Sequence, residues 1–433
     1  MWGTLLGKRT RLKVIVGSVV ALAGALLVAD FASAATITVT TGLDLFNATP
    51  GQGCSLRDAI QAANTDTAFG DCSAGSGADT IVFTPTLTKV MQTNTNSLSG
   101  NNDDNSYLDL DIVADDASAS GGVTLTIDGG PTGVVIEGDQ SGWADRIFDI
   151  VISNTGATPG GVVLRNLTIQ GGGKTLPLAD ETGSGSFCFQ GGGGVRSASG
   201  VTVTLESVTV QDNTMPRAGG GVCHNGGAPL IVDGSVITNN LVVDTVPVGA
   251  RGGGVAMGGG GSVTLTGTQV LSNSASSTGN GANAYGGGVY VADSSVLTVT
   301  NSSVVSNTSI ADDAGAGGSI LAQGGGVWTG SSSSQELIDS RIEGNVAEAT
   351  LSGSSGFSAD AYGGGVYAGF GSTQVLTGAQ VLSNSASSTG ANANAYGGGV
   401  YVADSSVLTV TNSSVLSNTS IADDAGVGGT VFA

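Results

Sequence analysis

A short frame of glycine, valine and asparagine recurs through the C-terminal half of this 433-residue sequence and restricts its fold more than any other feature. Each copy has a Gly-Gly-Gly-Val box and, further on, a Val-x-x-Asn box. The box valines are Val195, Val222, Val255, Val289, Val327, Val366 and Val400, and the asparagines are Asn213, Asn239, Asn273, Asn307, Asn345, Asn384 and Asn418. The two are 18 residues apart in six pairs and 17 apart in the pair Val222–Asn239, whereas 9 to 21 residues separate each asparagine from the next box valine.

A stretch of 50 residues occurs twice with four substitutions, at 269–318 and 380–429, so the frame belongs to a duplicated structural unit. A repeat with one fixed and one variable segment is typical of a solenoid, whose coils stack around a continuous core. The abundance of Gly, Ser, Thr and Val favours strands over helical repeats. The sequence therefore predicts a β-solenoid in which seven boxed coils follow about three less regular ones.

Residues 1–34 have the features of a secretory signal peptide. Four basic residues precede an apolar run at 14–28, and an Ala-Ser-Ala tripeptide at 32–34 matches a cleavage site. A retained anchor helix is the alternative, but the run is short for a membrane span. We therefore predict cleavage, no membrane insertion of the mature chain, and a location outside the cell, at the cell surface or associated with an outer membrane.

The charge balance limits the classes of partner. Removing residues 1–34 takes four of the 13 basic and one of the 34 acidic residues, which leaves 9 and 33 and a net charge of −24. Beyond Arg251, Arg341 is the one basic residue in the sequence. This balance disfavours nucleic acids and anionic lipids as partners, and it favours solubility and binding of divalent cations.

Residues 35–98 differ from the repeats and are predicted to cap the solenoid. The segment CSLRDAIQAAN at 54–64 is predicted to be an amphipathic helix with Ser55 as its N-cap. Its apolar face contains Leu56, Ala59, Ile60 and Ala63. A solenoid needs such a cover, because an open end exposes core and unpaired strand edges. Residues 99–433 then form the solenoid, with boxed repeats from about residue 190.

The same segment resembles the motif of a family of exported bacterial surface proteins named for its C-S-L-R-E-A signature, with Asp58 in place of the usual Glu. The boxes resemble the repeats of chlamydial-type polymorphic outer membrane proteins, although the aromatic residue usual before x-x-Asn is Val or Ile here. Together the resemblances cover nearly all of the mature chain. They imply a right-handed parallel β-helix of the pectin-lyase-like class, exported to the cell surface or beyond. They do not imply a catalytic activity.

The cysteines suggest disulfides. Cys54 and Cys72 flank the predicted helix and are expected to pair in an exported chain. Cys188 and Cys223 lie just before one glycine box and just after the next, so adjacent coils would bring them near each other, and their pairing stays open. The single histidine, His224, is expected to be packed or hydrogen-bonded in the interior rather than to bind zinc.

Alternation along the strands predicts the core. The box valine faces inward, as do the positions eight and ten residues later, and Gln335 and Gln374 interrupt the first of these two columns. Three successive glycines suit a tight corner with no room for a Cβ atom. Stacked asparagines at the other corner are expected to pass amide hydrogen bonds from coil to coil. Both boxes are therefore predicted to be structural.

One outward column is the main candidate for binding. The residue after the box valine is aromatic in four successive coils, as Tyr290, Trp328, Tyr367 and Tyr401. A row of exposed aromatic faces is a surface on which a sugar chain can stack. The alternative is a ladder of rings that stabilises the sheet, or rings covered by long loops. A threonine-rich outward column is interrupted by charged residues, so strand propensity explains it better than ice binding does.

Carboxylates are the remaining candidates. The boxed coils show no carboxylate column, and an enzyme on this fold would need such groups to converge. Weak Ca²⁺ candidates in the variable loops are Asp312, Asp313, Asp423 and Asp424. Further acidic pairs lie at 103–104 and 115–116, and none of these sites has an established calcium-binding spacing. Solvated loop charge is the simpler interpretation, and no other cofactor is predicted.

Residues 430–433 align with 319–322, which lead into another glycine box, so the sequence stops within a coil and its open end favours end-to-end self-association. We predict a non-catalytic, adhesin-like protein that binds polysaccharides or cell-surface glycans. One alternative is a polysaccharide lyase or glycoside hydrolase, which would require carboxylates from residues 99–190 or from the long loops to converge. The other is a passive structural spacer, and fold alone does not choose among them.

Overall fold

The computed structural model describes residues 34–93, 109–114, 123–139, 145–152, 159–173, 187–188, 190–245, 249–313, 317–352, 356–390 and 392–424. Contacts divide the chain into Met1–Phe31 and Ala32–Ala433, and only the second unit contains described residues. The predicted signal peptide, apart from residue 34, and the last residues, 425–433, therefore lie outside the described part.

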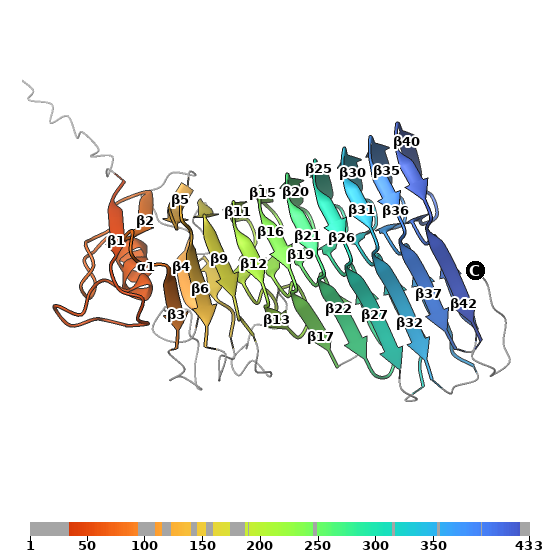
Figure 1. The fold of residues 1–433 in the computed structure, drawn as a ribbon, viewed down its shortest axis with the longest axis horizontal. Helices are drawn as coiled ribbons and strands as arrows, with labels where there is room; N and C mark the ends of the chain where they lie inside the picture. The colour runs from red at the N-terminus through yellow and green to blue at the C-terminus, as the bar shows by residue number, and fades with distance from the viewer. Residues whose placement is uncertain are drawn as a thin grey trace, which may run out of the picture. The chain divides into compact units, whose positions relative to one another are not determined.

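Within this part the chain is an all-β parallel β-helix with one short helix, which confirms the predicted fold class (Figure 1). The strands form five parallel sheets, numbered here in their order along a coil. The first sheet contains β4 (Leu110–Val113), β7 (Phe148–Val151), β10 (Val195–Ser197), β14 (Val222–His224), β19 (Val255–Met257), β24 (Val289–Val291), β29 (Val327–Thr329), β34 (Val366–Ala368) and β39 (Val400–Val402). The second contains β1 (Thr36–Val39), β2 (Asp79–Phe83), β5 (Val123–Asp128), β8 (Gly161–Arg165), β11 (Thr202–Glu206), β15 (Pro229–Asp233), β20 (Ser262–Thr266), β25 (Val296–Thr300), β30 (Ser334–Ile338), β35 (Thr373–Thr377) and β40 (Val407–Thr411).

The third sheet contains β3 (Lys89–Gln92), β6 (Val134–Gly138), β9 (Leu167–Gln170), β12 (Thr209–Gln211), β16 (Val236–Thr238), β21 (Gln269–Leu271), β26 (Ser303–Val305), β31 (Arg341–Glu343), β36 (Gln380–Leu382) and β41 (Ser414–Leu416). The fourth contains β13 (Thr214–Met215), β17 (Leu241–Asp244), β22 (Ser274–Thr278), β27 (Thr308–Asp313), β32 (Val346–Leu351), β37 (Ser385–Thr389) and β42 (Thr419–Asp423). The fifth contains β18 (Ala250–Arg251), β23 (Asn283–Tyr285), β28 (Ile320–Gln323), β33 (Ala359–Tyr362) and β38 (Ala393–Tyr396).

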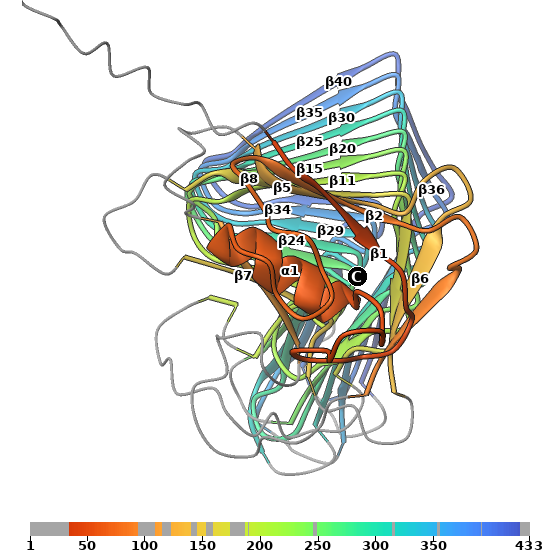
Figure 2. The same cartoon turned by 90° about the vertical axis from the view of Figure 1, so that its left-hand side faces the viewer.

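Each boxed coil has a thick part and a thin part. The first three sheets enclose the main apolar core, to which Val289, Leu297 and Val304 contribute one side chain from each sheet. The fourth and fifth sheets pack on each other through a separate cluster rich in alanine, such as Ala311 and Ala322, because small side chains let two sheets approach closely. We call these parts the body and the lobe. Viewed along the solenoid, the second sheet lies at the top and the first-sheet strands β24, β29 and β34 lie below it (Figure 2).

The body and lobe explain why one interval is fixed and the other varies. The segment from the box valine to the asparagine builds the three body sheets, whose strands stay in register from coil to coil. The segment from the asparagine to the next box builds the lobe, in which the fourth-sheet strand lengthens from two residues in β13 to six in β27. Insertions are therefore confined to the lobe, while the core of the body keeps one repeat length.

Each glycine of the box is required for a different reason. Gly324, the first of its box, has a positive φ of 61°. A Cβ atom on Gly325 would clash with the backbone of Val346. A Cβ atom on Gly326 would lie 2.9 Å from Cγ of Asn345 in the same coil. The glycines lie at the turn from the fifth to the first sheet and the asparagine at the turn from the third to the fourth, so the two boxes occupy separate corners, as predicted, and these corners face each other where the body meets the lobe.

The asparagines form a buried amide ladder, as predicted from their periodicity. Asn307 shows the pattern, because its backbone N–H and its Nδ2 both donate to Oδ1 of Asn345, at 2.9 and 3.0 Å, and Nδ2 also donates to the Val270 carbonyl at 2.9 Å. The ladder consists of Asn213, Asn240, Asn273, Asn307, Asn345, Asn384 and Asn418. Each side chain thereby satisfies backbone groups that the turn leaves open.

One member of the predicted ladder is wrong. Asn239 is exposed and has a φ of 55°, whereas its neighbour Asn240 is buried and continues the ladder between Asn213 and Asn273. With Asn240 in place, the interval from Val222 becomes 18 residues, the same as in the other coils. The single interval of 17 therefore marked a misassigned residue, since a shift of one position moves a side chain to the opposite face.

Two glutamines interrupt the core of the body where the sequence predicts it. Gln335 and Gln374 are 1% and 0% exposed and pair in register with each other and with Leu297 and Leu408. Thr329 donates to Oε1 of Gln335 at 3.1 Å. Within the described part of the chain, neither polar atom of the Gln374 side chain has a hydrogen-bond partner. The core here carries a desolvation cost that leucine would avoid.

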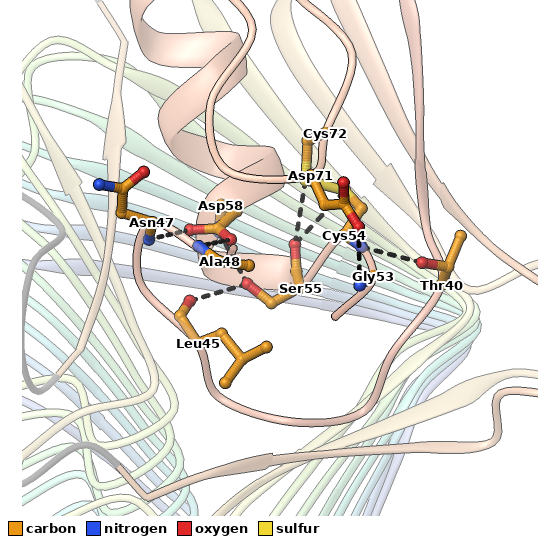
Figure 3. The surroundings of a disulfide bond; sticks show 10 residues. All are labelled: Thr40, Leu45, Asn47, Ala48, Gly53, Cys54, Ser55, Asp58, Asp71 and Cys72. Carbon is orange, nitrogen blue, oxygen red and sulfur yellow. Dashed lines mark hydrogen bonds between the residues drawn. A yellow bond between two sulfur atoms is a disulfide. The ribbon is translucent and has the colours of Figure 1, made fainter. Parts of the chain in front are cut away.

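Helix α1 (Leu56–Thr65) covers the first coils, as predicted (Figure 2). The Ser55 hydroxyl accepts from the Asp58 N–H at 3.0 Å and donates to the Leu45 carbonyl at 2.8 Å. The Asp58 carboxylate accepts from the N–H groups of Asn47 and Ala48 at 2.7 and 3.0 Å (Figure 3). Ser55 is therefore the N-cap, and the carboxylate fixes the preceding loop to the helix.

A disulfide closes the cap on itself, and a buried arginine attaches the cap to the solenoid. Cys54 and Cys72 form the predicted disulfide beside the start of α1 (Figure 3). Arg57, 1% exposed, donates from Nε to the Asp44 carboxylate at 2.7 Å and from Nη1 to the Asp109 carbonyl at 2.7 Å. Asp44 belongs to the loop before the helix and Asp109 precedes β4, so one guanidinium ties the cap to the first coils.

The last described coil exposes part of the core. Leu408, Val410 and Val415 are 41%, 47% and 45% exposed, because no described strand stacks beyond β40 and β41. Residues 430–433, on which the prediction of an incomplete coil rests, lie outside the described residues. In the described part of the chain, no helix has the length and apolar character needed to cross a membrane.

Candidate functional site

The four aromatic residues predicted as a column lie in register on the first sheet. Tyr290 pairs with Trp328, Trp328 with Tyr367, and Tyr367 with Tyr401. Their rings are stacked, with centroids 4.4, 5.9 and 5.4 Å apart and interplanar angles of 1°, 1° and 13°. The ring faces therefore contact each other along the solenoid, and between stacked rings only edges and polar groups are left to solvent.

A second aromatic column, which the sequence analysis missed, lies on the fifth sheet. Tyr285, Tyr362 and Tyr396 precede the glycine box in their coils and share a register position with Arg251 and Gln323. The signal was present in the sequence, because these five residues all stand immediately before a glycine box.

Rings of the first-sheet column and of the fifth-sheet column contact each other across the glycine box. Tyr285 contacts Trp328 with ring centroids 5.6 Å apart, and Tyr362 contacts Tyr401 at 4.9 Å, with the rings tilted by 58° and 54°. Outward side chains of two sheets that meet at a convex corner would diverge. The angle between the first and fifth sheets is therefore re-entrant, and aromatic rings fill it. We call the set Tyr285, Tyr290, Trp328, Tyr362, Tyr367, Tyr396 and Tyr401 the aromatic corner.

Polar groups of the second column bind to the first. Trp328 donates from Nε1 to Oε1 of Gln323 at 2.9 Å, and the guanidinium of Arg251 lies 6.0 Å from the ring centroid of Tyr290. Burial raises the pKa of the Tyr290 hydroxyl to about 12, against a smaller lowering by Arg251. Burial also raises the pKa values of Tyr285, Tyr362, Tyr367 and Tyr401. These phenols stay neutral at physiological pH and act as hydrogen-bonding groups.

The fold does not require aromatic residues at this corner. In earlier boxed coils, the position of Tyr290 is taken by Arg196, Cys223 and Ala256, in the same register and beside the same glycine box. Tyr290 itself is 8% exposed, whereas the other six members of the aromatic corner are half-buried. Four successive coils therefore carry aromatic residues at a position where the preceding coils have none, and the last three of these coils leave them partly exposed.

A disulfide lies at the N-terminal end of the aromatic corner. Cys188 and Cys223 are bonded, with a Cα–Cα distance of 5.7 Å, which resolves the pairing that the sequence leaves open. The neighbouring Phe187 stacks on Tyr290 with centroids 5.5 Å apart. The disulfide therefore holds Phe187 over Tyr290, the first ring of the stack. Because Phe187 covers it, Tyr290 is more deeply buried than the rings that follow.

The outward column of the first sheet continues from the aromatic corner to a charged cluster near the cap. Asp111, Asp149 and Arg196 occupy successive positions of this column. Ligand oxygens of Asp109, Asp111 and Asp149 lie within 4.8 Å of one another. Arg146 donates from Nη1 to Asp109 and Asp149, each at 3.1 Å, and Arg196 forms a bidentate pair with Asp149. Carboxylates from residues 99–190 therefore converge, but two guanidinium groups lie among them.

Burial dominates the electrostatics of this cluster. Asp109, Asp111 and Asp149 are 0%, 1% and 1% exposed. Burial raises the pKa of Asp109 well above its usual value, and the charges of Asp145 and Asp111 raise it further, while Arg146 lowers it. Arg196 is the most exposed of the groups and, with Asp149, lines a pocket of about 250 Å³. The cluster is a buried ion-pair network whose edge reaches the surface.

The structure does not bring the predicted calcium candidates together. Asp312 and Asp313 end β27 and Asp423 ends β42, with β32 and β37 between the two strands. Asp313 is buried, Asp312 and Asp424 are half-buried, and Asp423 is exposed. In the described residues, the group of three carboxylates close enough to share an ion is the Asp109 cluster, and not these four. The pairs at 103–104 and 115–116 lie outside the described residues.

His224 is an interior hydrogen-bonded residue, as predicted. Its ring is 0% exposed, Nε2 lies 2.8 Å from the Val201 carbonyl and Nδ1 accepts from the Gly226 N–H at 2.9 Å. Burial lowers its pKa, so the neutral ring donates from Nε2.

No protein-family model matches the sequence, and searches among curated proteins and solved structures found no match either.

Proposed function

We propose that the chain is an exported, non-catalytic, adhesin-like protein that binds polysaccharides or cell-surface glycans through the aromatic corner. Its two disulfides indicate an oxidising environment, in keeping with export. The resemblance of CSLRDAIQAAN and of the two boxes to exported bacterial surface proteins supports a place at the cell surface or beyond it.

A single observation carries this proposal: four successive coils stack a tyrosine or tryptophan ring that the fold itself does not need, and the last three of these rings are half-buried rather than buried. Contiguous, partly exposed aromatic surface is uncommon on soluble proteins and marks binding sites. Tyrosine and tryptophan also combine apolar area with a hydrogen-bonding group, which suits a ligand that carries both C–H faces and hydroxyls.

The stacked rings change the expected mode of binding. Neighbouring rings cover both faces of Tyr290, Trp328 and Tyr367 and one face of Tyr401, so a sugar cannot stack along the column as on a row of exposed flat rings. Ring edges, phenol hydroxyls and the amide of Gln323 remain, and these would hold a linear polymer by hydrogen bonds and van der Waals contacts along several coils. A solenoid suits this mode, since each coil repeats the same contacts.

Affinity electrophoresis of residues 35–433 through gels that contain neutral and acidic polysaccharides tests the proposal. We expect retardation in at least one gel, and we expect Trp328→Ala together with Tyr367→Ala to abolish it. The control is Phe370→Ala, because Phe370 is 57% exposed and lies outside the aromatic corner. Retardation that survives the double substitution, or its absence in every gel, would contradict the proposal.

A second candidate is a polysaccharide lyase or glycoside hydrolase at the Asp109 cluster. The convergence of three carboxylates beside a pocket favours it, because such enzymes act through paired carboxyl groups. It ranks second because the carboxylates are almost fully buried and engaged by Arg146 and Arg196. A cleared zone in the stained polymer that Asp149→Asn eliminates would establish the enzyme and remove the adhesin proposal.

A further inference from the structure

Carboxylates flank the aromatic corner on both sides. Asp293 follows β24 and Asp404 follows β39 at the same position of their coils, and both are exposed. On the fifth sheet, Asp360 lies two residues before Tyr362 and is half-buried. The carboxylates belong to the first, second and fourth of the four aromatic coils, so they are spread along the solenoid rather than gathered at one point.

These carboxylates are close enough to act on the rings. Burial is the largest cause of the raised pKa of Tyr362, and the negative charge of Asp360 is the second largest. For Tyr401, burial is again the largest cause and the charge of Asp404 is the second largest. Asp293 also raises the pKa of Tyr290. A cation that contacts these phenol hydroxyls would therefore also lie in the field of a carboxylate.

Positive charge at the aromatic corner is limited to one end. Arg251 lies over Tyr290 in the first aromatic coil, and Arg341, the one basic residue after Arg251 in the sequence, lies on β31 of the third sheet. The chain without residues 1–34 carries a net charge of −24. An acidic polymer along the corner would meet repulsion from nearby carboxylates and from the whole protein.

We propose that the polysaccharide bound at the aromatic corner is a linear amino-sugar polymer whose free amines are protonated. This inference rests on the proposed function and specifies its ligand class. Ring edges and hydroxyls contact the sugar rings, and Asp293, Asp360 and Asp404 pair with ammonium groups at intervals along the chain. A polymer fits better than a single sugar, because the carboxylates lie in different coils.

Affinity electrophoresis of residues 35–433 at pH 6 through three gels tests the inference, with glycol chitosan, fully N-acetylated glycol chitosan and polygalacturonate as the probes. We expect glycol chitosan to bind about tenfold more tightly than the N-acetylated polymer, a difference of about 1.4 kcal/mol. We also expect this advantage to fall as salt is added, since exposed charges are screened. Polygalacturonate is expected to leave the mobility unchanged.

The control separates local pairing from net charge. Asp293→Asn with Asp404→Asn removes two charges beside the rings, and Glu336→Gln with Asp339→Asn removes two exposed charges of β30 and the turn after it. We expect only the first pair to abolish the preference for glycol chitosan. Equal losses in both double variants would overturn the inference, as would polylysine bound as tightly as glycol chitosan.

The remaining outcomes distinguish this inference from the proposed function. Equal or stronger binding of the N-acetylated polymer, lost on Trp328→Ala with Tyr367→Ala, would overturn the amino-sugar assignment and leave glycan binding standing. Binding of polygalacturonate without binding of either chitosan polymer would also overturn the amino-sugar assignment and leave glycan binding standing. Unchanged mobility in all three gels and in the wider panel of neutral and acidic polymers would overturn both.

Discussion

Nδ2 of Asn345 lies 3.0 Å from the position that a Cβ atom on Gly326 would occupy. The same Nδ2 donates to Oδ1 of Asn384 at 2.9 Å and to the Val304 carbonyl at 2.9 Å. The two sequence boxes are therefore one structural feature, because the last glycine leaves the space that the ladder amide fills. Their constant separation of 18 residues is the length of chain needed to travel around the body and return to this point.

The space beside the ladder predicts the effect of a single methyl group. Gly326→Ala would place Cβ 2.7 Å from the Gly365 carbonyl oxygen and 2.9 Å from Cγ of Asn345, so the ladder would have to move. We expect a loss of about 2–4 kcal/mol in the free energy of unfolding. Gly260→Ala is the control, because Gly260 has a positive φ of 77° and open space around it. It should cost about 1 kcal/mol in urea titrations; equal costs would refute the packing explanation.

The corrected ladder gives a comparison between neighbours. Asn240→Ala would leave Asn213 and Asn273 without their amide partner and the Val210 carbonyl without its donor. We expect it to cost about 3–5 kcal/mol, since several buried polar groups lose partners. Asn239→Gly removes an exposed side chain at a positive φ and should change stability by less than about 1 kcal/mol. Thermal and urea unfolding of both variants would show the difference, and a larger effect at Asn239 would contradict the assignment.

The repeat was enough to predict the fold from the sequence. Its period, its glycines and its alternating apolar positions point to stacked parallel coils, and the N-cap Ser55 with the apolar face of α1 points to a cap. The division into body and lobe was not predicted, because side chains alternate between inward and outward positions in the same way whether two sheets meet at a convex or a re-entrant angle. Asn239 was misassigned because two asparagines are adjacent, and only strand register decides which one faces inward.

The candidate site was predicted in part. The column Tyr290, Trp328, Tyr367 and Tyr401 follows from counting residues after each box, but ring stacking depends on side-chain orientation, which periodicity does not give. The convergence of Asp109, Asp111 and Asp149 arises in the less regular coils, where no constant spacing links the residues. Contacts between irregular segments are set by tertiary packing, so sequence spacing does not reveal them.

The glutamines of the body core predict a stabilising substitution. Gln374→Leu would match the leucine at the same position of the next coil, Leu408, and would remove two buried polar atoms that lack partners in the described part of the chain. We expect a gain of about 1–3 kcal/mol in the free energy of unfolding. Gln335→Leu should gain less, because it would leave the Thr329 hydroxyl with only its longer hydrogen bond, 3.4 Å, to the Tyr367 carbonyl. Denaturant titration of both variants tests this order, and a loss of stability at Gln374→Leu would show that the amide has a partner such as a buried water.

The disulfide beside the aromatic corner predicts a local effect. Cys188→Ser with Cys223→Ser opens a loop of 35 residues and frees Phe187 from Tyr290. We expect a loss of about 3–4 kcal/mol, of which loop entropy supplies most. Because coils of a solenoid interact mainly with their neighbours, the near-ultraviolet circular dichroism of Trp328 and its ring neighbours should change before the far-ultraviolet signal. Coincident loss of both signals would mean that the disulfide supports the whole solenoid equally.

The charged cluster near the cap predicts a dependence of stability on pH. Burial raises the pKa of Asp109 in the folded state well above its unfolded value near 3.8, so between these two values the folded chain holds a proton that the unfolded chain has lost. Stability from this group is therefore present at low pH and falls as the pH rises through that window.

Asp109→Asn keeps an acceptor for Arg146 and cannot ionise, so its stability relative to the wild type should rise with pH, by about 1.4 kcal/mol for each unit by which the pKa is raised. Urea titrations from pH 4 to 8 measure the trend, with the exposed Asp233→Asn as a control that should leave the profile unchanged. If the difference between Asp109→Asn and the wild type is constant with pH, the carboxyl is ionised throughout and Arg146 outweighs its burial.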